Sequence, residues 1–130
     1  MRTFKTRWFA RFARREGMSD EALREAIERA ERGLIDADLG GGLIKQRIAR
    51  PGGGRSGGYR TIIAYRIADR AVFLDGFAKS EQGNISNEEL AELRVIAQNW
   101  LRASTKTVRT AIKSGLILEM NYEDQDESID

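Results

Sequence analysis

Two helices followed by three strands are predicted by the spacing of apolar residues in the first 80 positions. Apolar side chains recur at helical spacing up to Gly17 and again between Ser19 and Gly33, with Ser19 as a candidate N-cap and each glycine as a candidate helix end. Three runs then read as strands, at residues 43–49, 59–67 and 70–77. The short turn between the last two predicts antiparallel neighbours. Residues 4–6 fit either a helix start or a short edge strand.

The last third of the chain predicts more helix. Ser86 and Glu89 have the spacing of a capping box at a helix start, and a shorter helix is expected between Ser104 and Gly115. Residues 116–120 fit a strand or an extended segment. We therefore expect an α+β fold in which two N-terminal helices pack on a small, twisted, mainly antiparallel sheet of three to four strands, with a C-terminal helix.

Alternation along the strands separates an apolar face from a basic one. In the first strand Ile44 and Ile48 share one face, and Lys45 and Arg47 share the other. In the second strand one face is predicted to carry Arg60, Ile62, Ala64 and Arg66, and the opposite face Tyr59, Thr61, Ile63 and Tyr65. We expect the sheet to bury one face against the helices and to leave parts of the other polar and basic.

Composition predicts one domain over residues 1–120 and an acidic, disordered tail over residues 121–130. Residues 1–79 hold 17 Lys and Arg against 10 Asp and Glu, and the rest of the chain holds 5 against 10. The chain has no Cys and no His, which excludes disulfides, thiol nucleophiles, Cys/His zinc sites and histidine acid–base chemistry; no metal or cofactor is expected. The absence of a signal-like or membrane-spanning apolar run predicts a cytoplasmic protein.

Six cations and no carboxylates occur between residues 43 and 66: Lys45, Arg47, Arg50, Arg55, Arg60 and Arg66. The glycine-rich stretch at 52–58 precedes a strand rather than a helix, so it does not match a nucleotide-binding loop, and a flexible hairpin with Arg55 at its tip is favoured. Tyr59 and Tyr65 alternate with the cations. Arginines beside aromatic rings suit single-stranded nucleic acid, where phosphates pair with cations and bases stack.

Three elements of this region resemble the RelE/HigB family of bacterial toxins. They are Lys45-x-Arg47, Ser56-Gly57-Gly58-Tyr59-Arg60 before an apolar strand, and Phe77-Ala78-Lys79-Ser80-Glu81. The similarity covers about residues 3–120, and the elements follow in the family's order. The resemblance implies the toxin of a type II toxin–antitoxin pair, an mRNA interferase (endoribonuclease) that cuts mRNA on the ribosome and inhibits translation.

The resemblance also implies a mechanism without metal or cofactor, in which the 2′-OH of the RNA attacks the adjacent phosphate. Matched by position, the catalytic residues are Lys45, Arg47, Arg60, Lys79 and Glu81. Arg60 would stabilise the charged transition state. Lys45, whose neutral form nearby cations favour, and Glu81 are rival bases. The RNA-binding residues would be Arg50, Arg55, Tyr59, Tyr65 and Arg66, with Arg55 holding backbone phosphate.

Two departures from the family pattern leave alternatives open. Close relatives carry Tyr where Asp75 stands and Asn where Ser80 stands. If Asp75 faces the basic sheet it would weaken the field that attracts RNA, and an exposed strand-end residue is the other interpretation. The alternatives are a non-enzymatic toxin of the same fold that inhibits a protein such as DNA gyrase, an attenuated RNA-binding member of the family, and a plain nucleic-acid-binding module. The partners implied are mRNA, the ribosome and an antitoxin, in HigB-like pairs a helix-turn-helix (HigA-like) protein.

Overall fold

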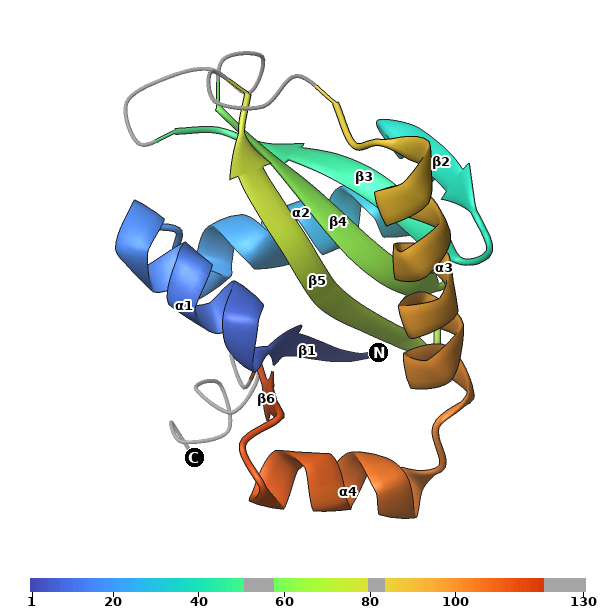
Figure 1. Ribbon diagram of the computed structural model, residues 1–130. Coiled ribbons are helices and arrows are strands. Elements are labelled where there is room, and N and C mark those ends of the chain that lie inside the picture. Colours follow the sequence, from blue (N-terminus) through green and yellow to red (C-terminus); the bar gives the residue numbers. More distant parts are fainter. Residues whose placement is uncertain (51–57, 80–83, 121–130) are drawn as a thin grey trace.

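The computed structural model describes residues 1–50, 58–79 and 84–120. Its strands are β1 (Arg2–Thr6), β2 (Ala37–Gly40), β3 (Leu43–Ile48), β4 (Tyr59–Arg66), β5 (Arg70–Ala78) and β6 (Ile117–Glu119). Its helices are α1 (Arg7–Glu16), α2 (Asp20–Glu31), α3 (Asn87–Arg102) and α4 (Thr105–Lys113). The strands form one sheet in the order β2-β3-β4-β5-β1-β6 (Figure 1). The α+β class is therefore confirmed.

The prediction of three to four strands is wrong, because the sheet has six in the part of the chain that the structure describes. Residues 4–6 belong to β1, which lies inside the sheet, parallel to β5 and antiparallel to β6. The other pairings are antiparallel, so the sheet is mainly antiparallel as expected. β1, β2 and β6 have only three to five residues each, too few for a clear alternation of apolar and polar positions.

Helices cover both faces of the sheet, which corrects the prediction that only one face packs against helices. On one face α1 and α2 pack on a core that includes Ile44, Ile63 and Phe73. On the other face α3 and α4 pack on a second core that includes Ile62, Val72 and Leu101 (Figure 1). The predicted alternation in β3 and β4 is confirmed, but most positions on the face expected to be open lie under α3. The C-terminal helix is a pair, α3 and α4.

The predicted helix starts are confirmed by side-chain caps. Ser19 accepts a hydrogen bond from the backbone N–H of Ala22 at the start of α2, and Ser86 and Glu89 form the capping box of α3. α1 ends at Gly17 in the left-handed conformation, with φ of 74°. These local signals lie within a few residues of the chain, which is why the sequence could show them.

Candidate functional site

Two arginines lie directly opposite each other in neighbouring strands. Arg47 of β3 is the register partner of Arg60 of β4, and Arg60 in turn is opposite Phe77 of β5. Arg47 is exposed, whereas Arg60 is 8% exposed. Like charges directly opposite in a sheet repel each other, so an anion bound between the two side chains would be stabilised.

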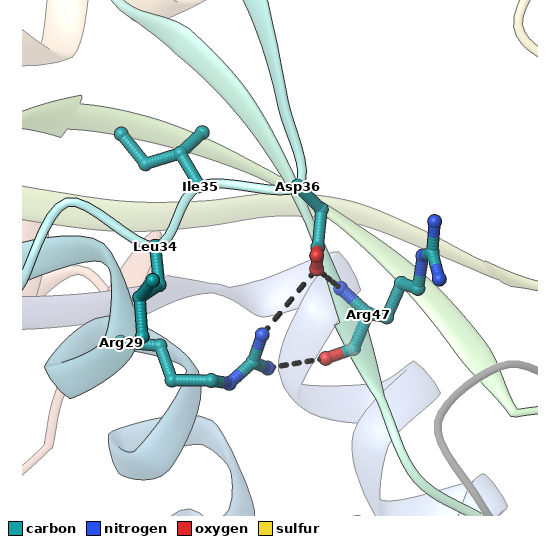
Figure 2. Close-up of a pocket in the computed structure, with 5 residues that line it drawn as sticks. All are labelled: Arg29, Leu34, Ile35, Asp36 and Arg47. Atoms are coloured by element: carbon teal, nitrogen blue, oxygen red, sulfur yellow. Dashed lines mark hydrogen bonds and ion pairs between the residues drawn. The ribbon is translucent and has the colours of Figure 1, made fainter.

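The backbone of Arg47 is held from the side away from β4. Its N–H donates to Asp36 Oδ2 at 2.7 Å, and its carbonyl accepts from Arg29 Nη2 at 2.5 Å (Figure 2). Because these groups point away from β4, Arg47 and Arg60 form a non-hydrogen-bonded pair, in which the two Cα atoms lie about 4.5 Å apart and the side chains are closest. The Arg47 guanidinium points away from Arg29 and Asp36 in Figure 2. Its geometry suits a phosphate held between Arg47 and Arg60.

Lys45 lies on the same face as this pair, two residues along β3. It is opposite Ile62 of β4. The Lys45 side chain is half-buried and lines a pocket of about 170 Å³ with Leu39, Asn84, Ile85 and Leu90. The N-terminal end of α3 therefore lies beside Lys45, which is less exposed than Arg47.

Lys79 completes the group at this end of the sheet. It directly follows β5, its backbone N–H donates to the carbonyl of Gly58 at 3.2 Å, and its side chain is exposed. The structure thus brings Lys45, Arg47, Arg60 and Lys79 together at one end of β3, β4 and β5. Glu81 and Arg55, also predicted for the site, lie outside the described residues.

Asp75 lies on the basic face. A register shift between Ile62 and Ile63 places Asp75 opposite Ile62, which separates it from Lys45 in the same cross-strand row, while Gly76 faces α1. Burial raises the pKa of Asp75, and the nearby Glu89 of α3 raises it further, against a lowering by the hydrogen bond from the Gly76 N–H at 2.8 Å. The face therefore carries one partly buried carboxylate, and the interpretation of Asp75 as a mere strand-end residue does not hold.

The structure does not support Tyr59 and Tyr65 as base-stacking residues. Both lie on the opposite face, 4% and 9% exposed, in the core under α1 and α2. The Tyr59 hydroxyl donates to Glu16 Oε1 at 3.1 Å. Burial raises the pKa of Tyr65, and the charge of Glu31 adds to the effect. Since a buried ring cannot stack on RNA, we leave both out of the proposed site.

Arg50 and Arg66 are also separated from the arginine pair. The Arg50 guanidinium lies 5.4 Å from the centroid of the Tyr59 ring, which belongs to the opposite face. Arg66 is six residues from Arg60 along β4, about 20 Å away. It donates to Asp69 and to the carbonyl of Leu101 at the end of α3. The contacts of Arg66 give it a structural role at the far end of the sheet.

A family comparison accounts for these elements as a set. A sequence model described as the RelE toxin of the RelE/RelB toxin–antitoxin system matches residues 1–120. The chain belongs to the RelE toxin family. It is thus related to the toxins of toxin–antitoxin systems, and membership implies an antitoxin as partner. A search of curated proteins finds no match to the chain. No helix in the described part of this RelE-family chain is long and apolar enough to cross a membrane.

Sequence reasoning missed the residues behind Arg47. Arg29 lies on α2 between Ala26 and Ala30, and its side chain is only 6% exposed. It pairs with Glu25 at 2.9 Å and with Asp36 at 3.3 Å. The one available signal was an arginine next to two alanines of an apolar stripe, which leave space for a long side chain. The contact with Arg47 joins residues 18 positions apart, and no local pattern indicates it.

Proposed function

We propose that this RelE-family toxin is a metal-independent endoribonuclease that cleaves mRNA on the ribosome and so inhibits translation. The observation that carries the proposal is the Arg47–Arg60 pair, two cations in register on neighbouring strands, of which Arg47 is exposed and Arg60 is 8% exposed. A phosphodiester between them would relieve their repulsion, and its transition state, which carries more negative charge, would relieve more.

In the proposed reaction the 2′-oxygen of a ribose attacks the adjacent phosphorus as the bond to the 5′-oxygen breaks. The products are a 2′,3′-cyclic phosphate and a 5′-hydroxyl. Arg60 and Arg47 bind the phosphate oxygens, Lys45 or Glu81 takes the 2′ proton, and Lys79 supplies a proton donor for the leaving oxygen. In a chain without histidine, these groups are the acid–base candidates that the family's positions provide.

The proposed partners follow from the family and from the charge of the face. The antitoxin would bring acidic or apolar segments to the basic face, or block its access to the ribosome. A helix-turn-helix antitoxin of the HigA type remains the expectation from the resemblance.

The test compares induced expression of the wild type, Arg47→Ala and Arg11→Ala in a bacterial host, followed by mapping of mRNA 5′ ends. Arg11 is an exposed cation on α1, at the other face of the sheet, so its variant removes the same charge away from the site. We expect growth arrest with new ends inside translated codons for the wild type and Arg11→Ala, and loss of both for Arg47→Ala. Arrest by the wild type without new ends would contradict nuclease activity and support a toxin that inhibits a protein target.

A further inference from the structure

Buried polar side chains take the place of a strand beside Arg47. β2 pairs with β3 only as far as Lys45, so at Arg47 no strand among the described residues lies on the outer side of β3. Asp36 and Arg29 fill that position, as described above. Gln46, fully buried, extends the network: its amide accepts from the Asp36 N–H at 2.8 Å and donates to the carbonyls of Ala26 at 2.9 Å and Leu34 at 3.2 Å.

We propose that Arg29 and Asp36 are positioning residues that hold the Arg47 peptide, so that Arg47 and Arg60 bind one phosphate together. The inference rests on the proposed function of the face. The planar guanidinium of Arg29 is suited to the task, because its nitrogens reach Glu25, Asp36 and the Arg47 carbonyl at the same time. Figure 2 shows the two dashed contacts that converge on the Arg47 backbone from these side chains.

Stability alone does not account for this arrangement. The pairing of β3 with β4 already extends over six residue pairs, from Leu43 to Ile48. Burial of the charged Arg29 side chain carries a desolvation penalty, and a protein with an apolar side chain of similar size at such a position is often as stable. Arg29 and Asp36 fix the orientation of the Arg47 backbone at the point where β3 is no longer paired with β2.

The test is a double-mutant cycle between Arg29→Met and Arg47→Ala, with cleavage of a single-stranded RNA on ribosomes as the readout. If Arg29 acts through Arg47, Arg29→Met should reduce cleavage about 10- to 100-fold in a protein that keeps Arg47. In the Arg47→Ala background the same change should alter cleavage by no more than about twofold, because the group that it positions is gone. Equal losses in both backgrounds would overturn the proposal.

Asp36 provides a second variant for the case that Arg29→Met does not fold. The side chain of Asp36 is 25% exposed, against 6% for Arg29, and the residue lies just before β2. Asp36→Ala should reduce cleavage, and Asp36→Asn, which keeps an acceptor for the Arg47 N–H, should recover most of it. An Asp36→Asn protein no better than Asp36→Ala at equal melting temperature would contradict the positioning role.

Glu25→Gln is the matched control, since Glu25 pairs with Arg29 but forms no hydrogen bond or ion pair with a residue of β3 in the described structure. We expect its cleavage to stay within about twofold of the wild type. Failure of the inference is distinguishable from failure of the proposed function. If Arg47→Ala cleaves as well as the wild type, the proposed site is wrong; if Arg47→Ala is inactive while Arg29→Met and Asp36→Ala retain full cleavage, only the positioning role is wrong.

Discussion

The sheet carries an arginine pair at each end of β4, and the two pairs differ in what surrounds them. Arg60 is opposite Arg47, and Arg66 is opposite Arg70. At the second pair the protein supplies the acceptors: Arg66 binds Asp69 and the carbonyl of Leu101, and Arg70 binds two carbonyls at the end of α3. At the first pair the Arg47 guanidinium makes no hydrogen bond or ion pair to any described residue.

The difference shows that neighbouring strand arginines alone do not indicate an anion site. The C-terminal end of a helix carries partial negative charge on its last carbonyls, and cations there are stabilising. At the Arg66–Arg70 end α3 presents that terminus, so the pair fastens the helix to the sheet. At the Arg47–Arg60 end α3 begins rather than ends, and its N-terminal residues line the pocket of Lys45. The orientation of one helix therefore separates the structural pair from the proposed functional pair.

The largest effect should come from Arg60→Ala. We expect cleavage to fall at least about 100-fold, because a group that stabilises transition-state charge is lost. Arg70→Ala, the matched change at the other end, should retain cleavage per folded molecule within about twofold. Single-turnover cleavage rates of the purified variants on programmed ribosomes would test this. Equal losses in the two variants would show that the two ends do not differ in function.

Stability should show the reverse order. In Arg70→Ala the carbonyls of Trp100 and Ala103, each 2.8 Å from Arg70 Nη1, lose their donor, which should cost about 1 to 3 kcal/mol of the free energy of unfolding. Urea unfolding of Arg70→Ala and of Arg47→Ala would measure it. Arg47→Ala should cost less, and a larger loss than that of Arg70→Ala would contradict the assignment of a structural role to the α3 end.

Asp75→Asn should make the face of Arg47 and Arg60 more positive, because it removes the carboxylate of Asp75 from that face. The pKa of Asp75 is raised, so between the unfolded value of about 3.9 and the raised value the native state binds more protons. Stability of the wild type therefore falls as pH rises through that window, and the cost persists at neutral pH. Asp75→Asn should therefore have a higher free energy of unfolding than the wild type at neutral pH. This difference should disappear at about pH 3, where Asp75 of the wild type is protonated in both states. Urea unfolding at the two pH values would measure it.

The same variant should bind RNA more tightly, since one negative charge leaves the face. Binding of a single-stranded RNA oligonucleotide at several salt concentrations would measure it. Weaker binding by a folded Asp75→Asn protein would mean that Asp75 contributes to the site rather than weakening it.

The smallest effect is expected at Arg2, which lies on β1 opposite Arg70 but finds its acceptor on β6. Arg2 of β1 donates to both oxygens of Glu119 of β6, at 2.8 and 2.9 Å, and holds the pKa of Glu119 below its usual range. This contribution is present above the unfolded pKa of about 4.3 and is lost as pH falls through the lowered value. Because the pair is partly exposed, Glu119→Gln should cost less than about 1 kcal/mol, measured by thermal unfolding at neutral pH, with cleavage unchanged.

Local chemistry was sufficient for much of the fold. Ser19, Ser86 and Gly17 mark helix ends through contacts within a few residues, and the alternation in β3 and β4 assigned Lys45, Arg47 and Arg60 to one face. The strand β2 escaped prediction, and the sequence offered β1 and β6 only as one of two alternatives, because the pairing partners of β1 and β6 are distant in the chain. β1, for example, lies between β5 and β6, and no local pattern encodes such a pairing.

By itself the sequence determined the class of fold, the family and the absence of histidine and cysteine. Amino-acid composition, the spacing of apolar residues and short motifs can all be read without knowing which distant residues are in contact. Only the tertiary structure decided which cations lie together. It placed Tyr59 and Tyr65 in the core, assigned Arg66 to the end of α3 and brought Arg29 and Asp36 behind Arg47. The physical reason is that a side chain's role depends on which distant acceptors and charges surround it, and those are set by the packing of strands and helices.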